Sequence, residues 1–162
     1  METVTIGFSK SKKKFAIGSW LIRKWMRTEY SHVYIKFQSN SLNRELIYEA
    51  VGTGLRFIGT KVWESHALEV KSYLIEVKKC NQIRLLQYCV DNAGVEYGTV
   101  QNLGIFTAKV FGNKKNKFNQ GKNCSEVIGE ILKLEGYEIK KDVNLLTPLD
   151  IDLILSKNQS LT

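Results

Sequence analysis

The sequence has few cysteines, no long apolar run and no secretory pattern at its start, and each absence narrows what the chain can be. Three cysteines are too few, and odd in number, for a disulfide scaffold, which favours a reducing compartment. No apolar run approaches the roughly 20 residues of a membrane span. Residues 1–20 carry a lysine run without the apolar segment of a secretory signal. At 162 residues we therefore expect one domain, 1–162, with no signal peptide and no transmembrane segment.

Acidic residues are also scarce, since 24 Lys and Arg stand against 16 Asp and Glu, a formal net charge of +8. The excess is local: residues 1–44 hold nine Lys and Arg against two acids, and residues 109–122 hold five Lys and no acid. One interpretation is an anionic partner, nucleic acid or anionic lipid, bound through Lys10–Lys14 and Lys109–Lys122. The other interpretation is a pair of solvated loops, because only five of the 24 are arginine, whose planar fork suits phosphates and bases.

The pattern of apolar residues, glycines and turn residues predicts an α+β protein. Strands are expected at 3–8, 31–37, 45–51, 55–58 and 67–77, and helices at 15–27, 80–93, 123–134 and 147–155. Thr147 is the expected N-cap of the last helix, with Pro148 in its first turn. Trp20 and Trp25 are interpreted as core residues rather than a base-stacking platform. Helices at both ends of consecutive strands favour a small antiparallel sheet with flanking helices.

Cys124 is the candidate nucleophile. The run Asn123-Cys-Ser-Glu126 has capping-box spacing, which makes Asn123 the N-cap and Cys124 the first helical residue. The positive end of the helix dipole and the free backbone N–H groups there favour a thiolate and suit an oxyanion. The alternative is a small buried cysteine on an amphipathic helix.

A thiol nucleophile needs an imidazole and a group that orients it. Of the two histidines, His66 lies in an expected loop and is interpreted as a surface or satisfied core residue, whereas His32 opens a predicted strand. If strands 31–37 and 45–51 form a symmetrical hairpin, His32 lies opposite residue 49 or 50, and Glu49 can contact its ring. An acid in the apolar run around Glu49 is costly unless paired. The alternative is an outward-facing strand acid.

No metal or cofactor is expected. Cys80 and Cys89 lie nine residues apart, about half a turn out of phase on one helix, and the sequence has no Cys-x-x-Cys pair. Both are interpreted as small core residues.

The order His–Glu–Cys resembles the YiiX-like, circularly permuted NlpC-type papain-fold proteins, whose relatives include lecithin retinol acyltransferase-like enzymes. The matching residues are Tyr30-Ser-His-Val33, Tyr48-Glu-Ala50 and Asn123-Cys-Ser-Glu126. The resemblance implies a circularly permuted papain-like fold. It also implies that Cys124 is the nucleophile, His32 the general base and Glu49 the residue that orients the imidazole.

Supporting roles are less specific. Relatives often place a tyrosine near the nucleophile, for which Tyr30 and Tyr97 are the candidates here, and Asn123 and Ser125 are candidates for supporting the thiol or the oxyanion.

The implied activity is that of a cysteine peptidase or amidase-like hydrolase, or an acyltransferase, acting on an amide or ester bond. The substrate would be a peptide, peptidoglycan or lipid-type acyl compound. The alternative is a non-catalytic basic module that has the fold without turnover and binds an anionic partner. We expect a cytoplasmic protein from a phage or bacterium, virion-associated if phage-encoded, and the sequence does not indicate its oligomeric state.

Overall fold

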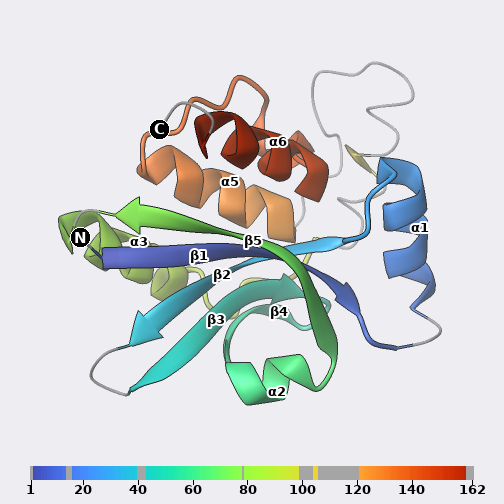
Figure 1. Ribbon diagram of the computed structural model, residues 1–162, viewed down its shortest axis with the longest axis horizontal. Coiled ribbons are helices and arrows are strands. Elements are labelled where there is room, and N and C mark those ends of the chain that lie inside the picture. Colours follow the sequence, from blue (N-terminus) through green and yellow to red (C-terminus); the bar gives the residue numbers. More distant parts are fainter. Residues whose placement is uncertain are drawn as a thin grey trace.

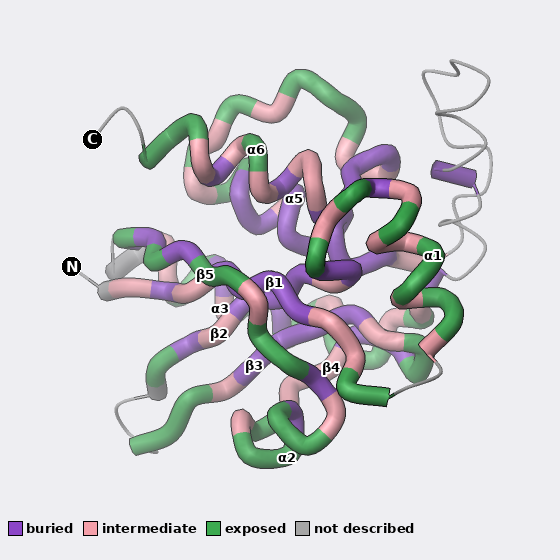
Figure 2. The backbone as a smooth tube through the Cα atoms, turned by 45° about the vertical axis from the view of Figure 1, so that its right-hand side comes forward, coloured by how far each residue is buried: buried purple, intermediate pink, exposed green. Residues whose placement is uncertain are grey.

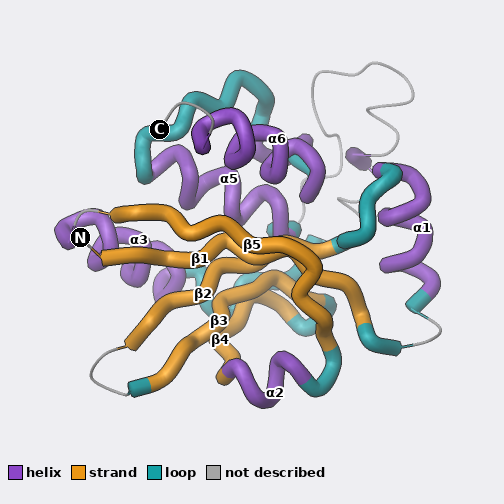
Figure 3. The backbone as a smooth tube through the Cα atoms, viewed as in Figure 1, coloured by secondary structure: helices purple, strands orange, loops and turns teal. Residues whose placement is uncertain are grey.

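The structure, a computed structural model, describes residues 2–13, 16–39, 43–77, 79–98, 104–105 and 121–159. These residues form an antiparallel five-stranded sheet in the order β4–β3–β2–β1–β5, with helices around it (Figures 1 and 3). The strands are β1 (Glu2–Ser11), β2 (His32–Ser39), β3 (Arg44–Val51), β4 (Gly54–Gly59) and β5 (Ala67–Val77). The helices are α1 (Ile17–Met26), α2 (Thr60–Glu64), α3 (Lys79–Asp91), α5 (Cys124–Leu134), the short 3-10 helix η1 (Val143–Leu145) and α6 (Pro148–Gln159). The predicted α+β class and antiparallel sheet are therefore confirmed.

The two faces of the sheet pack against different helices. On one face, every second residue of the middle strands belongs to the main core, as Ile35 of β2 and Tyr48 of β3 do. This core also contains buried residues of α3, α5 and α6. The other face carries Tyr34 and Ile47, which pack with Trp63 of α2. Helix α2 lies on the opposite side of the sheet from α5 and α6 (Figure 1). Because both faces are covered, a polar side chain in the middle strands is removed from water and needs a partner.

Side-chain caps set where α5 and α6 begin. The Asn123 side-chain oxygen accepts a hydrogen bond from the backbone N–H of Glu126 at 2.9 Å, which confirms the predicted N-cap and makes Cys124 the first residue of α5. Thr147 caps α6, since its hydroxyl accepts from the Asp150 N–H at 3.3 Å while the Asp150 carboxylate accepts from the Thr147 N–H at 2.8 Å. Both starts depend on local side-chain chemistry, so they could be predicted from the sequence.

The structure differs from the sequence-based expectations at three points. The first strand does not end at the polar run after Phe8 but continues to Ser11, because Ser9–Ser11 pair with the start of β5 across a bulge. Helix α2 was not predicted, since five residues carry too little periodicity to be recognised. Trp20 is not a core residue: its side chain is 52% exposed on α1. The expected loop at 112–121 and the ambiguous segment 103–111 lie almost entirely outside the described residues.

The register between β2 and β3 also differs from the prediction. Ile35 lies opposite Tyr48, and extending that register places His32 opposite residue 51 rather than 49 or 50. By the same extension residues 32 and 49 lie on one face as diagonal neighbours, which is within reach of long side chains. The last β2–β3 pair is Ile35 with Tyr48, so the His32 and Glu49 side chains lie beyond the end of the paired ladder.

Candidate active site

Cys124 lies at the point where α5 meets the sheet. It is the first residue of that helix, it is buried, and α5 contacts both β2 and β3. At this position its backbone N–H has no acceptor within the helix, and the positive end of the helix dipole favours an anion. The start of α5 therefore supplies the electrostatic setting that a thiolate needs.

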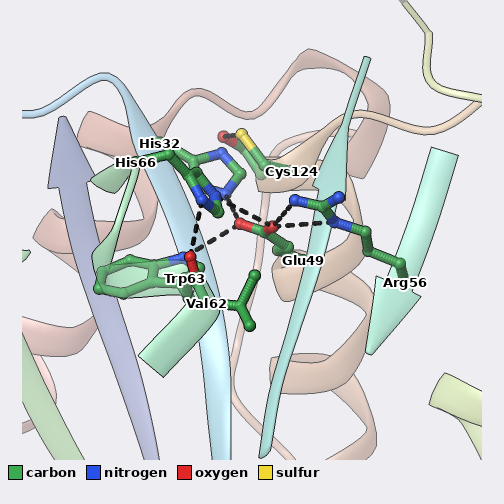
Figure 4. A network of polar contacts seen from close by, with 8 residues as sticks. His32, Glu49, Arg56, Val62, Trp63, His66 and Cys124 are labelled. Carbon is green, nitrogen blue, oxygen red and sulfur yellow. Dashed lines mark hydrogen bonds and ion pairs between the residues drawn. The ribbon is translucent and has the colours of Figure 1, made fainter. Parts of the chain in front are cut away.

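His32 stands between Cys124 and Glu49 (Figure 4). Its Nε2 lies 3.3 Å from Oε2 of Glu49, and the ring lies close enough to the Cys124 thiol for each group to shift the pKa of the other. With Nε2 directed to the carboxylate, Nδ1 is the nitrogen left for the thiol. The structure thus brings together the three residues that the sequence singled out, although helix α5 lies far along the chain from the β2–β3 hairpin.

The carboxylate of Glu49 is held from several sides. Only 2% of the side chain is exposed, so the interpretation as an outward-facing strand acid was wrong. Arg56 donates from Nε at 3.1 Å and from Nη2 at 2.8 Å to one carboxylate oxygen, and the Trp63 indole donates to the other at 3.1 Å. His66 approaches the first oxygen at 3.9 Å. These partners fix the carboxylate, which in turn fixes the ring of His32 (Figure 4).

The titration of the three groups is strongly coupled. Burial would lower the pKa of the His32 imidazole, but the charge of Cys124 and the hydrogen bonds of Cys124 and Glu49 raise that pKa from 6.5 to about 10. Burial would raise the pKa of the Cys124 thiol, but the charge and hydrogen bond of His32 lower it. Each group therefore favours the charged form of the other, thiolate for Cys124 and imidazolium for His32. Burial would also raise the pKa of Glu49, yet His32 and Arg56 lower it to about 2, so its carboxylate is ionised.

Ser125 lies beside the thiol, and Asn123 acts on it only through the start of the helix. The Ser125 hydroxyl lies 3.9 Å from Sγ, and its hydrogen bond, with that of the Val33 backbone N–H, adds to the lowering of the Cys124 pKa. Asn123 is buried and caps the helix, while its Nδ2 has no hydrogen-bond partner among the described residues. Both residues therefore lie at the start of α5 next to Cys124, and a role toward an oxyanion stays a prediction.

Tyr30 lies outside this cluster. Its hydroxyl donates to Asp152 of α6 at 2.5 Å, and Asp152 also accepts from Lys71 at 2.7 Å. Burial and this bond raise the pKa of Tyr30. The structure assigns Tyr30 to an α6–sheet contact, whereas Tyr97 lines the cavity next to Cys124.

An apolar cavity of about 480 Å³ adjoins Cys124. Its walls come from α1, from the start of α5 and from the segment that leads into α6. The lining includes Leu21, Ile22, Trp25, Cys124, Leu146 and Pro148. The thiol thus faces a space that accepts an apolar group.

Sequence reasoning missed the residues that hold Glu49. The pairing of Glu49 with Arg56 follows from the two-residue turn between Val51 and Gly54, so a hairpin argument would have found it. Gly54 has φ +113°, and a Cβ there would meet the Val95 carbonyl at 2.8 Å, which explains the glycine. Trp63 and His66 had no such signal, because their positions depend on how α2 packs.

The predicted basic segments are only partly described. Lys122 forms an ion pair with Glu130 at 2.5 Å, so its charge is compensated locally, and Lys109–Lys117 lie outside the described residues. In the earlier segment, Lys12 donates to the Glu64 carbonyl at 2.5 Å, and Lys14 is outside the description. Among the described residues, His32 is the charged group that lowers the pKa of Cys124.

Two searches of the described residues were negative. No group of three or more His, Cys, Asp or Glu side chains in these ranges is arranged to hold a metal ion. No helix in the same ranges has both the length and the apolar character needed to cross a bilayer.

Comparison of the chain with protein-family models, with curated proteins and with solved structures found no match. Functional inference therefore depends on the geometry of the site.

Proposed function

We propose that this protein is a thiol-dependent hydrolase or acyltransferase that acts on an amide or ester bond. The observation that carries the proposal is the ordered contact of Cys124, His32 and Glu49, with the thiol at a capped helix start beside an apolar cavity. A nucleophile, a base and an orienting carboxylate are the parts that covalent acyl transfer requires.

The chemistry follows from these positions. The Cys124 thiolate attacks the carbonyl carbon, a C–S bond forms, and the oxyanion accepts hydrogen bonds from the free N–H groups at the start of α5. The tetrahedral intermediate collapses, the C–N or C–O bond breaks, and the His32 imidazolium gives its proton to the leaving amine or alcohol. Neutral His32 then takes a proton from water or an acceptor nucleophile, which attacks the thioester and releases the thiolate. Glu49 keeps the imidazole oriented throughout.

The resemblance to circularly permuted papain-like proteins agrees with this proposal. A histidine at the start of a strand, a carboxylate on the next strand and a cysteine opening a late helix is the order that the resemblance rests on. We propose the permuted papain-like fold on that basis, together with the antiparallel sheet beside α5.

The lining of the cavity indicates which class of substrate fits. Side chains of Leu21, Ile22 and Trp25 offer no charged partner for a polar peptide, so an apolar acyl group fits this space best. Among the peptide, peptidoglycan and lipid-type substrates considered above, the lipid type is favoured.

Trapping the acyl-enzyme tests the proposal. With p-nitrophenyl octanoate as probe, mass spectrometry of the full chain is expected to show one octanoyl group, mapped by digestion to the peptide that contains Cys124. The Cys124→Ala variant is expected to show none there. Acylation confined to lysines, at the same level in Cys124→Ala, would contradict the proposal.

A substitution in the cavity wall tests the preference for apolar acyl groups. Gly18, Ile22 and Trp25 lie on one face of α1 and all line the cavity, and a Cβ at Gly18 meets nothing within 4 Å. Gly18→Phe should therefore be tolerated and should fill part of the space. We expect kcat/KM for the octanoyl ester to fall roughly tenfold, a loss typical of one displaced apolar contact.

The acetyl ester is the internal control, because its acyl group does not reach the wall and its kcat/KM should stay unchanged. An equal loss for both esters would show that the cavity does not hold the acyl chain.

A further inference from the structure

Helix α1 exposes large apolar side chains next to the cavity. Ile17 is 67% exposed, Trp20 52% and Leu21 53%, and these three share the outer face of the helix. Figure 2 shows α1 as a largely exposed or half-buried element beside the buried α5. Single exposed apolar residues are common on protein surfaces, but three on one helix face form a patch of the kind that marks an interaction site.

Basic residues continue the same face of α1. Lys24 is exposed one turn after Trp20 and Leu21, and its ammonium lies 5.8 Å from the centre of the Trp20 ring. Arg27, the residue that caps the end of α1, is exposed as well. Residues 12–30 contain six Lys and Arg and a single acid, Glu29. Tryptophan and aliphatic side chains flanked by lysine and arginine are the composition of helices that lie in the interface of a bilayer.

We propose that α1 docks on the surface of an anionic lipid bilayer. Ile17, Trp20 and Leu21 enter the boundary between headgroups and acyl chains, and Lys24 and Arg27 contact the phosphates of anionic lipids. Nucleic acid would use the positive charges but has no counterpart for Ile17 and Leu21. A second copy of the chain would bring one basic helix against another, which like-charge repulsion opposes.

The position of α1 connects this surface to the candidate site. Leu21 belongs both to the exposed patch and to the lining of the cavity beside Cys124. Provided that the proposed acyl chemistry holds, a lipid acyl chain passes from the bilayer along α1 into the cavity without crossing water. Binding itself does not require the chemistry, so Cys124→Ala should bind vesicles as the wild type does.

Vesicle co-sedimentation of the full chain tests the docking. We expect binding to phosphatidylcholine vesicles that contain phosphatidylglycerol, weaker binding to pure phosphatidylcholine, and a decrease with added salt. Ile17→Ser with Leu21→Ser should weaken binding at least tenfold, because two half-exposed aliphatic contacts with lipid are lost. Lys24→Gln with Arg27→Gln should weaken it roughly tenfold for the anionic vesicles only.

Matched controls come from other surfaces. Leu74→Ser removes a 63% exposed leucine from β5, and Lys133→Gln with Lys157→Gln removes two exposed charges from α5 and α6. Both variants should bind as the wild type does, and the circular dichroism of each variant verifies its fold.

Three results would overturn the docking proposal. One is equal binding of wild type and the Ile17/Leu21 variant. A second is a dimer in sedimentation that the Leu21 substitution dissociates. The third is binding to a nucleic acid probe that depends on Lys24 and Arg27 while vesicles are not bound. Failure of vesicle binding with intact acylation of Cys124 would remove the docking and leave the proposed function in place.

Discussion

Cys124→Ala is expected to lower the turnover of p-nitrophenyl octanoate by about 10⁴-fold or more, because the reaction then lacks its nucleophile. The thiol is small and sits at a helix start that Asn123 caps independently, so the variant should remain folded. The measurement is the steady-state rate of p-nitrophenol release by wild type and variant, each divided by the concentration of folded protein.

Cys89→Ala is the matched control for this substitution. Cys89 is a buried thiol on α3, and burial raises its pKa, so it is inert as a nucleophile. We expect the turnover per folded molecule to stay within about twofold of wild type. A large residual rate in Cys124→Ala, or an equal loss in Cys89→Ala, would contradict the assignment of Cys124.

Glu49→Gln is expected to reduce the free energy of unfolding by about 3 kcal/mol at neutral pH. The substitution keeps the shape but removes the charge that Arg56, Trp63 and His32 face. Breaking a buried charge pair costs about 3–5 kcal/mol, and Arg56, which is 39% exposed, keeps part of its hydration, so the lower end applies. Urea unfolding followed by circular dichroism measures the change.

The dependence of the free energy of unfolding on pH tests the role of Glu49 independently. The pKa of Glu49 is about 2 in the folded protein, against 4.5 for an unperturbed glutamate. The contribution of Glu49 to the stability of the fold is therefore complete above pH 4.5 and is lost as the pH falls toward 2. The gap between wild type and Glu49→Gln should therefore close on acidification. Glu45→Gln on the same strand is the control, since Glu45 is exposed and pairs with Lys36 at 3.7 Å, a pair worth about 0.5 kcal/mol. A Glu49→Gln protein as stable as wild type at neutral pH would contradict the described network.

The parts of the fold that could be predicted from the sequence are those fixed by neighbouring residues. Asn123 and Thr147 cap their helices through contacts three residues away, so α5 and α6 begin as expected. Strand β2 could also be predicted, because apolar and polar residues alternate around Ile35. The identity of the candidate site could be predicted because a cysteine at a capped helix start and a buried acid each call for a chemical partner.

The remaining features depend on contacts that no local pattern encodes. A hairpin argument predicted that Glu49 could contact His32, but the two residues lie beyond the paired part of β2 and β3, so their contact depends on how the strand ends pack. Trp63 reaches Glu49 only because α2 covers that face of the sheet. Trp20 is a case in which a local pattern misled. Its helical spacing predicted a core residue, but its side chain is exposed to solvent on α1.

The ionisation of Cys124 tests the central claim most directly. Alkylation by iodoacetamide, followed at the Cys124 peptide by mass spectrometry across a range of pH, yields the apparent pKa of the thiol. The account predicts a pKa below the value of about 8.5 for a free cysteine, and a clear rise of that pKa in His32→Ala, where the charge of the imidazolium no longer opposes the effect of burial. A pKa near 8.5 in wild type that His32→Ala leaves unaltered would contradict the thiolate–imidazolium pair.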